Sequence, residues 1–331
     1  MDDAVREALA DFLREGTRNG LNPIVAYSLD DDAMILLTTW IPVLPLAIDV
    51  LKRATGQDYS LGHHLTRAKA TRACSENPHV FMMNEREIAG LGNQEFVDIG
   101  RVVSIFGAPY FTQKAFGLVD ICGFSKLPHP EQLSQLYGLT STLASSCRRA
   151  AKYCRTLGGA STRFGHASTG DGFYIWHDMV GGGADTAVFL VVICMMVQAE
   201  AMRRRSGFPM CLKGGFIIDG AFMLYDTTQP AVPSALAVNA VGPATNGAAR
   251  LIAAASPGQL LLADFERSGQ GGHRMTPQTL LAQVNELFRQ EGHGPASLRV
   301  EPDEPLAIED KHGIPWYCWN VTGEVPNSVD D

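Results

Sequence analysis

Alternation between short apolar runs and longer helix-compatible segments runs through the second two thirds of the chain. The apolar runs predict strands, at 116–121, 163–168, 173–177, 211–218, 221–225, 259–263, 297–300 and 316–321. Apolar residues at helical spacing predict helices over 2–14, 131–154, 184–205 and 245–255, and one that opens at Thr276-Pro277. Gly138 can divide the longest of these helices. The predicted core order is β-αα-β-β-α-β, an α+β fold related to the split βαβ plan.

Composition changes near Gly107-Ala108-Pro109, and this change predicts a domain boundary. The helix over 2–14 leads us to expect a mainly helical N-terminal region, whose role the sequence does not indicate. The predicted organisation is this N-terminal region at 1–110, a regular α+β domain at 111–325 and a short tail at 326–331.

Two apolar runs are candidates for contact with a membrane. The run 187–197 is too short to span a bilayer, and the run 33–48 carries Pro42 and Pro45. We predict that both are core segments, with interfacial membrane docking of 33–48 as the alternative. The first residues include Asp2 and Asp3 and no apolar stretch typical of a secretory signal. The seven cysteines form no C-x-x-C pair, so we expect reduced thiols and a soluble, cytoplasmic protein.

The charge balance restricts the class of partner. Of 331 residues, 46% are hydrophobic and 19% charged, as in a globular protein. Lys and Arg number 27 against 35 Asp and Glu, a formal charge of -8, so no basic footprint for a long nucleic acid is present. An anionic ligand must therefore be held by metal ions or by a few local cations.

Two acidic residues stand where strands are predicted to end. Asp120 ends an apolar strand, and Asp171 lies in a Gly-Asp-Gly turn between two strands. Each has a structural alternative, as a helix cap or as an ordinary hairpin turn. If neighbouring strands carry both, the carboxylates can converge on hard divalent cations, which prefer oxygen ligands. The glycine turn after Asp120 would leave backbone N–H groups for phosphate oxygens.

A second candidate group lies on the helix predicted near 245–255. Asn246 and Arg250 are four residues apart, hence on one helix face, and the residues between them are small. Asn can orient a ribose, and Arg can neutralise charge on a transferring phosphoryl group. The alternative is a surface arginine with a capping asparagine.

Together these residues resemble the class III nucleotidyl cyclases, the family of adenylate and guanylate cyclase catalytic domains. The segments that match, in the family's order, are 118–125, 168–173, 212–220, 241–251 and 256–260. The resemblance covers about 112 to 325. The resemblance implies the family's catalytic domain, with a ferredoxin-like βααββαβ core.

The resemblance also implies roles for individual residues. Asp120, Asp171 and the backbone carbonyl of Ile121 would bind two Mg²⁺ or Mn²⁺ ions per active site. Asn246 would position the ribose, and Arg250 would stabilise the pentavalent phosphorus. Triphosphate contacts are expected at Gly123, Phe124 and Lys311, although Lys311 matches loosely and a surface lysine is the alternative. In the family each site is composite, so a homodimer is expected.

The family reads the nucleobase at two positions, and here both depart from its pattern. At these two positions adenylate cyclases have Lys and Asp, and guanylate cyclases have Glu and Cys. This chain has Ala167 and Asn239 there. Alanine forms no hydrogen bond, and Asn239 matches the hydrogen-bonding edge of uracil or cytosine. Arg163 and His166 are further candidates for contact with the base.

The departure resembles the pyrimidine cyclases of bacterial anti-phage defence, whose cyclic UMP or cyclic CMP activates a separate effector protein. The main hypothesis is a nucleotide cyclase that makes a cyclic pyrimidine mononucleotide, with UTP favoured over CTP. The first alternative is an adenylate cyclase with relaxed base readout. The second is a catalytically inactive cyclase-like dimerisation module. A diguanylate cyclase is favoured least, because its Gly-Gly-Asp/Glu-Glu-Phe signature is absent from the sequence.

Overall fold

The computed structural model describes much of the chain, and most of the second predicted domain. The described residues are 22–29, 33–39, 63–64, 66–76, 81–87, 111–156, 163–177, 181–224, 239–268, 274–290, 297–309, 313 and 315–324. Packing divides the chain into two units. The first is Met1–Thr112 with Phe222–Ala240, and the second is Gln113–Ala221 with Val241–Asp331.

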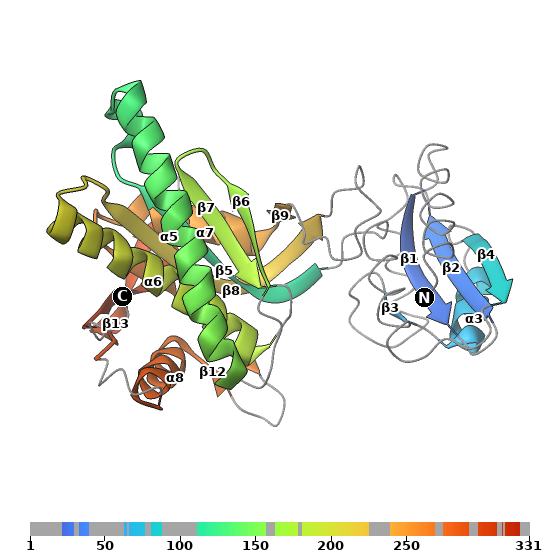
Figure 1. Ribbon diagram of the computed structural model, residues 1–331. Helices are drawn as coiled ribbons and strands as arrows, with labels where there is room; N and C mark the ends of the chain where they lie inside the picture. Colours follow the sequence, from blue (N-terminus) through green and yellow to red (C-terminus); the bar gives the residue numbers. More distant parts are fainter. Residues whose placement is uncertain are drawn as a thin grey trace. The chain divides into compact units, whose positions relative to one another are not determined.

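The described residues of the first 110 positions form a sheet with one helix (Figure 1). The sheet order is β3-β1-β2-β4, and β2 pairs antiparallel with both β1 and β4. The elements are β1 (Asn22–Leu29), β2 (Ala33–Thr39), β3 (His63–His64), α3 (Arg67–Glu76) and β4 (Phe81–Glu87). The expectation of a mainly helical region was therefore wrong for these described residues, where β-branched and apolar runs pair as strands. The predicted helix over 2–14 lies outside them, as do 40–48 of the long apolar run.

The second unit is an α+β structure built on one large mixed sheet. Its strands follow the order β13-β14-β10-β8-β5-β7-β6, and the short β9 also pairs with β8. The main elements are β5 (Phe111–Ile121), α5 (His129–Thr156), β6 (Phe164–Ser168), β7 (Gly172–His177), α6 (Gly182–Ser206), β8 (Leu212–Leu224), β9 (Asn239–Val241), α7 (Pro243–Ala254), β10 (Leu260–Ala263), α8 (Pro277–Gln290), β13 (Arg299–Glu309) and β14 (Pro315–Thr322). A 3-10 turn, η2 (Phe124–Lys126), follows β5, and β11 (Arg267–Ser268) pairs with β12 (Arg274–Met275).

The centre of this unit is the ferredoxin-like core expected from the sequence. The elements from β5 to β8 follow the order β-α-β-β-α-β, and their strands lie in the order fourth, first, third, second. The two helices predicted after the first strand are one continuous helix, α5, in which Gly138 packs against Phe208.

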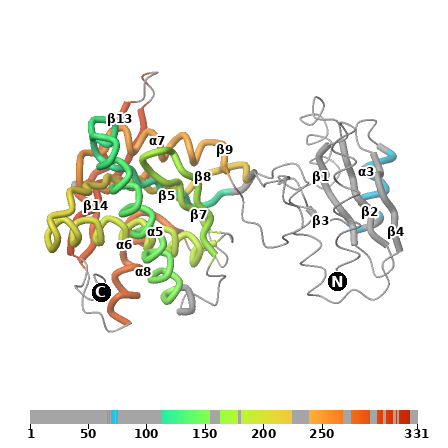
Figure 2. The backbone as a smooth tube through the Cα atoms, turned by 45° about the horizontal axis from the view of Figure 1, so that its top comes forward, coloured from blue at the N-terminus to red at the C-terminus, as the bar shows by residue number. Residues whose placement is uncertain are grey.

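Helices cover both faces of the central sheet (Figures 1 and 2). α5 and α6 lie on one face, where Phe189 of α6 stacks edge-on against Phe216 of β8 at 5.0 Å between ring centroids. α7 lies on the other face, where the Tyr174 hydroxyl of β7 donates a hydrogen bond of 3.1 Å to the Thr245 carbonyl. Alternating strand residues point to opposite faces, so one set builds the apolar core and the other faces α7.

α6 is the central core helix of this unit. It is the one helix among the described residues long and apolar enough to cross a membrane, but 78% of its apolar window is buried inside the domain. Every residue from Ala184 to Met195 is buried. The prediction that 187–197 is a core segment is therefore confirmed, and the Ala, Val, Leu and Ile side chains there pack against both α5 and the sheet.

Two predicted strand boundaries were wrong. The two strands predicted at 211–218 and 221–225 are one strand, β8, in which the Asp219 carboxylate accepts a hydrogen bond from the adjacent Gly220 N–H. The strand predicted at 297–300 continues to Glu309, since β13 is an edge strand paired antiparallel with β14. Edge strands tolerate proline, and the Pro305 in this segment hid it from the sequence pattern.

A buried ion pair joins the start of α6 to β11. Asp185 is 1% exposed, forms an ion pair with Arg267, and accepts a hydrogen bond of 3.1 Å from the Ala115 N–H of β5. Burial raises the pKa of Asp185 to about 6, because desolvation of the carboxylate outweighs the attraction of Arg267. A folded-state pKa above the ordinary value means that this group's contribution to stability is fully present at acidic pH and is lost as pH rises through about 6.

Replacing Arg267 by Leu is expected to lower the free energy of unfolding at pH 8 by about 3–5 kcal/mol, since it leaves a buried carboxylate unpaired. At pH 5 the loss should be smaller, because Asp185 then takes up a proton. Urea unfolding at both pH values measures this. The matched control is Arg299→Leu, which removes an exposed pair with Glu301 and should cost less than about 1 kcal/mol. Equal losses for both variants, or equal losses at both pH values, would contradict the account.

Candidate active site

The ends of β5 and β7 bring Asp120 and Asp171 together. The two strands are antiparallel, with Asp120 directly opposite Gly172, and the Ile121 N–H donates a hydrogen bond of 3.0 Å to the Asp171 carbonyl. Gly172 is required at this point, because a Cβ there would lie 2.4 Å from the Val119 carbonyl oxygen and 3.1 Å from Asp120 Oδ1. The structure thus places the two predicted carboxylates side by side at the edge of a glycine turn.

The electrostatics of this pair fit a cation site. The pKa of Asp120 is raised, first by desolvation of its half-buried carboxyl group and next by the negative charge of Asp171, while Lys213 opposes the shift. A divalent cation between the carboxylates would offset their repulsion. No cluster of three or more His, Cys, Asp or Glu side chains occurs among the described residues, so further ligands would have to be carbonyl, water or substrate oxygens.

Lys213 of β8 lies across from Asp120, with Nζ 3.3 Å from Asp120 Oδ2. The sequence analysis did not predict this residue as part of the site. Cys122 N–H donates to the Cys211 carbonyl at 2.8 Å, which sets the alignment of β5 with β8 and places Lys213 opposite Asp120. That alignment joins segments some 90 residues apart in the chain. The strand pattern therefore gave no signal for it.

The turn after Asp120 is tight. Gly123 has φ 70°, a left-handed conformation that favours glycine, and its carbonyl accepts a hydrogen bond from the Lys126 N–H. Phe124 is half-buried, and its carbonyl accepts a hydrogen bond from the Leu127 N–H. The predicted triphosphate residues Gly123 and Phe124 thus lie in a compact turn that begins two residues after the buried Ile121.

Asn246 and Arg250 lie one turn apart on α7, as predicted, and both border a cavity. Asn246 is exposed and Arg250 is half-buried. Together with Trp316 and Glu309 they line a cavity of about 430 Å³. The guanidinium carbon of Arg250 lies 4.5 Å from the ring centroid of Trp316. Trp316 was not predicted as part of the site, because its strand meets α7 only in the folded sheet.

Within one chain the carboxylate pair and the Arg250 group are apart. α7 lies over β8, where Leu251 packs against Gly215, and Arg250 extends to Trp316 on β14. Asp120 lies on β5, and β10 and β8 separate β14 from β5 in the sheet. Three inter-strand spacings are about 14 Å. Within one chain, the carboxylate pair and the Asn246–Arg250 pair therefore lie in two separate places.

The residues predicted to read the base are not gathered in one described pocket. Ala167 is half-buried on β6, opposite Tyr174. Asn239 is exposed at the start of β9, where its side-chain oxygen accepts a hydrogen bond from the Ala240 N–H. His166 is exposed and packs edge-on against Phe173 at 5.6 Å. Arg163 is half-buried, and Lys311 lies outside the described residues.

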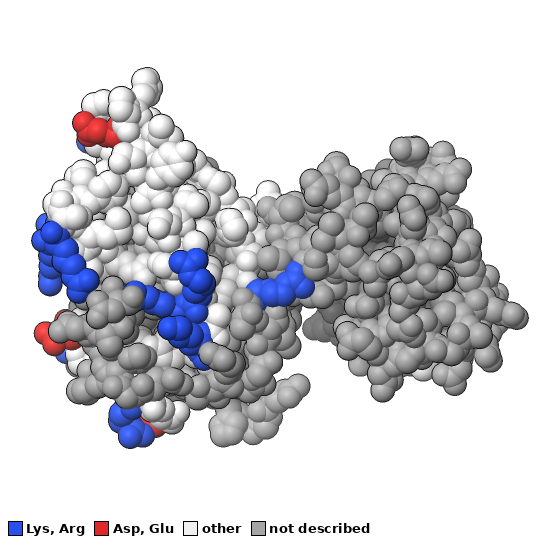
Figure 3. All heavy atoms as spheres, in the orientation of Figure 1, with Lys and Arg blue, Asp and Glu red and all other residues white. Residues whose placement is uncertain are grey.

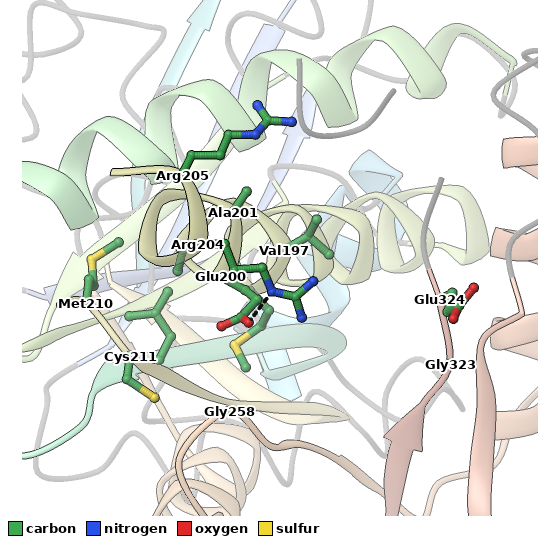
Figure 4. Close-up of a pocket in the computed structure, with 13 residues that line it drawn as sticks. Val197, Glu200, Ala201, Arg204, Arg205, Met210, Cys211, Gly258, Gly323 and Glu324 are labelled. Atoms are coloured by element: carbon green, nitrogen blue, oxygen red, sulfur yellow. Dashed lines mark hydrogen bonds and ion pairs between the residues drawn. The ribbon is translucent and has the colours of Figure 1, made fainter. Parts of the chain in front are cut away.

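A second, larger cavity of about 760 Å³ contains none of the predicted residues (Figure 4). It lies beside the last turns of α6, where Glu200 forms ion pairs with Arg203 and Arg204. Hydrogen bonds from Arg203 hold the pKa of Glu200 well below its usual range.

On the face in Figure 3, the Lys and Arg side chains of the described residues form separate groups, without a continuous basic stripe.

No protein-family model and no curated protein sequence matches this chain. Among solved structures, the adenylyl cyclase CyaB from P. aeruginosa is similar, with 14% identity, 65% of this chain and 97% of that chain covered, and a TM-score of 0.41. The guanylate cyclase domain of RhGC from Catenaria anguillulae, in complex with GTP, has 12% identity, 65% and 99% coverage and a TM-score of 0.42. The guanylyl cyclase Cya2 has 14% identity, 66% and 95% coverage and a TM-score of 0.39. These are similarities of fold, so the functional conclusion depends on the site residues.

Proposed function

We propose that this protein is a nucleotidyl cyclase that converts a pyrimidine nucleoside triphosphate to its 3′,5′-cyclic mononucleotide and pyrophosphate. The ribose 3′-OH loses its proton and forms a bond to the α-phosphorus, while the bond from that phosphorus to the bridging oxygen of pyrophosphate breaks. The observation that carries the proposal is the adjacent pair of carboxylates, Asp120 and Asp171, with Lys213 3.3 Å from Asp120.

The chain's residues divide the work of binding and of charge neutralisation. Asp120, Asp171 and the Ile121 carbonyl would hold two Mg²⁺ or Mn²⁺ ions, which supply activation of a hydroxyl and polarisation of phosphoryl oxygens when bound. Lys213 brings a positive charge to the same place, where a phosphate oxygen can compete for it with Asp120. The turn at Gly123 and Phe124 and the cation of Lys311 would hold the rest of the triphosphate.

Asn246 and Arg250 complete the chemistry from a second copy of the chain. Arg250 would neutralise the charge that develops on the α-phosphoryl group, and Asn246 would orient the ribose. Because α7 directs Arg250 towards β14, away from the carboxylates of its own sheet, a homodimer with two composite sites is the assembly that unites all four residues.

Selection of a pyrimidine is the finer part of the proposal. Ala167 has no side-chain hydrogen-bonding group, so the amino and carbonyl edges of a purine find no partner there. Asn239 can both donate and accept, as the edge of uracil or cytosine requires, and we favour UTP over CTP. By its resemblance to the anti-phage pyrimidine cyclases, the product would be a cytoplasmic second messenger for a downstream effector protein in defence against phage.

Product identity tests the substrate. Wild-type protein is incubated with ATP, GTP, CTP and UTP together at equal concentration with Mn²⁺, and the cyclic nucleotides are identified by mass. Cyclic UMP should dominate, with cyclic CMP next. A dominant cyclic AMP peak would overturn the pyrimidine assignment while leaving the cyclase intact. Replacing Ala167 by Lys should shift the product distribution towards cyclic AMP. Tyr137→Lys, which adds the same charge at an exposed position on α5, serves as its control.

A further inference from the structure

The indole ring of Trp316 lies beside the catalytic half-site on α7. Its centroid is 4.5 Å from the guanidinium carbon of Arg250, within the range of about 6 Å for a cation–π contact. Trp316, Arg250 and Asn246 line the same cavity. We propose that Trp316 is a positioning residue that holds the Arg250 guanidinium in the orientation it needs in the cyclase site. This role rests on the proposed function.

The ring itself is fixed from two sides. Gly247, one turn before Arg250, is buried, and a Cβ there would lie 2.8 Å from Trp316 Cζ3 and 3.2 Å from Cη2. The ring therefore packs directly against the backbone of α7. Its own backbone belongs to β14, where Trp316 is paired with Ile308 of β13. A helix and a strand thus determine where the ring lies, so it provides a rigid surface under a flexible side chain.

Stacking orders arginine without occupying its hydrogen-bonding edges. The guanidinium donors lie in the plane of the group, so a ring against one face does not itself occupy them. An unsupported arginine loses rotamer entropy when it becomes ordered in the transition state. Trp316 reduces that loss beforehand, and its contribution should therefore appear in kcat more than in KM.

Substitution of Trp316 separates positioning from a structural role. Trp316→Leu should lower kcat about 10-fold with KM changed less than about 2-fold, because a cation–π contact of ordinary strength corresponds to a factor of that order. Trp316→Phe keeps an aromatic face and should recover most of the rate. Tyr317→Leu, at the exposed neighbouring position on β14, is the control and should retain the wild-type rate.

A structural measurement keeps the two proposals distinguishable. The side-chain N–H resonance of Arg250, assigned by its loss in Arg250→Lys, should show a ring-current shift that disappears in Trp316→Leu. An active wild type with unchanged kcat in Trp316→Leu would overturn the positioning role, as would equal losses for the Leu and Phe variants together with a lowered melting temperature. A folded wild type that forms no cyclic nucleotide would overturn the proposed function and the positioning role with it, even if the ring-current shift is present.

Discussion

Replacing Asp120 by Asn is expected to lower the rate of cyclic-nucleotide formation by about 10³-fold or more. Asparagine has the same shape, but it is neutral and a weak ligand for a hard cation, so a site built on two carboxylates loses half of its negative charge. Metal ions supply several kcal/mol of charge stabilisation in phosphoryl transfer, and each 1.36 kcal/mol corresponds to a factor of ten in rate. Product formation by mass spectrometry, at Mn²⁺ concentrations from micromolar to millimolar, measures the effect.

The matched control is Asp219→Asn. Asp219 lies on β8, the same strand as Lys213, but six residues further along it. It should keep wild-type activity and show the same Mn²⁺ dependence. Thermal melting should show that Asp120→Asn folds, since removal of a half-buried charge next to Asp171 relieves a repulsion that raises the Asp120 pKa. Wild-type activity in folded Asp120→Asn would show that the carboxylate pair is not the metal site.

Two inactive variants should restore one another when they are co-expressed. Asp120→Ala removes a carboxylate, and Arg250→Ala removes the cation of the other half-site. In a homodimer of either variant, both sites are therefore incomplete. A mixed dimer has one site with the carboxylates of one chain and the arginine of the other, and that site is intact. With random pairing, half of the dimers are mixed and each has one of two sites, so about a quarter of wild-type activity is expected.

Co-expression of Asp120→Ala with Asp171→Ala is the control for this experiment. Both changes lie in the same half-site, so a mixed dimer has one carboxylate missing from each site and activity should stay at background. Mass spectrometry of differently tagged chains measures the fraction of mixed dimers. Background activity in a confirmed Asp120→Ala and Arg250→Ala mixed dimer would contradict the composite site.

Local pattern was sufficient for the parts of the site that lie at the ends of single elements. Asn246 and Arg250 share a helix face, which helix periodicity predicted. Asp120 and Asp171 end or join predicted strands, so the strand pattern allowed them to meet, and the resemblance to the cyclases implied that they do. Lys213 and Trp316 were missed because each meets its partner through the alignment of strands distant in sequence. Such alignments are fixed by tertiary packing, which a single sequence does not display.

The errors in the fold have similar causes. Asp219-Gly220 is a dipeptide typical of a hairpin turn. It lies inside β8, however, where pairing with β5 and β9 keeps the backbone extended. Pro305 indicated a loop in the sequence, because proline has no N–H to donate within a sheet. β13 is an edge strand, however, and its outer side needs no such hydrogen bond. Within the first 110 positions, apolar runs of seven or eight residues formed strands in the described part of the chain.

The most direct measurement is the stoichiometry of products formed by purified wild-type protein. The protein is incubated with each of the four ribonucleoside triphosphates and Mn²⁺, and cyclic nucleotide and pyrophosphate are quantified together. We expect equal amounts of a cyclic pyrimidine mononucleotide and pyrophosphate, abolished by EDTA and restored by excess Mn²⁺. No cyclic product from any of the four nucleotides, with protein shown to be folded and dimeric, would contradict the assignment of this chain as a nucleotidyl cyclase.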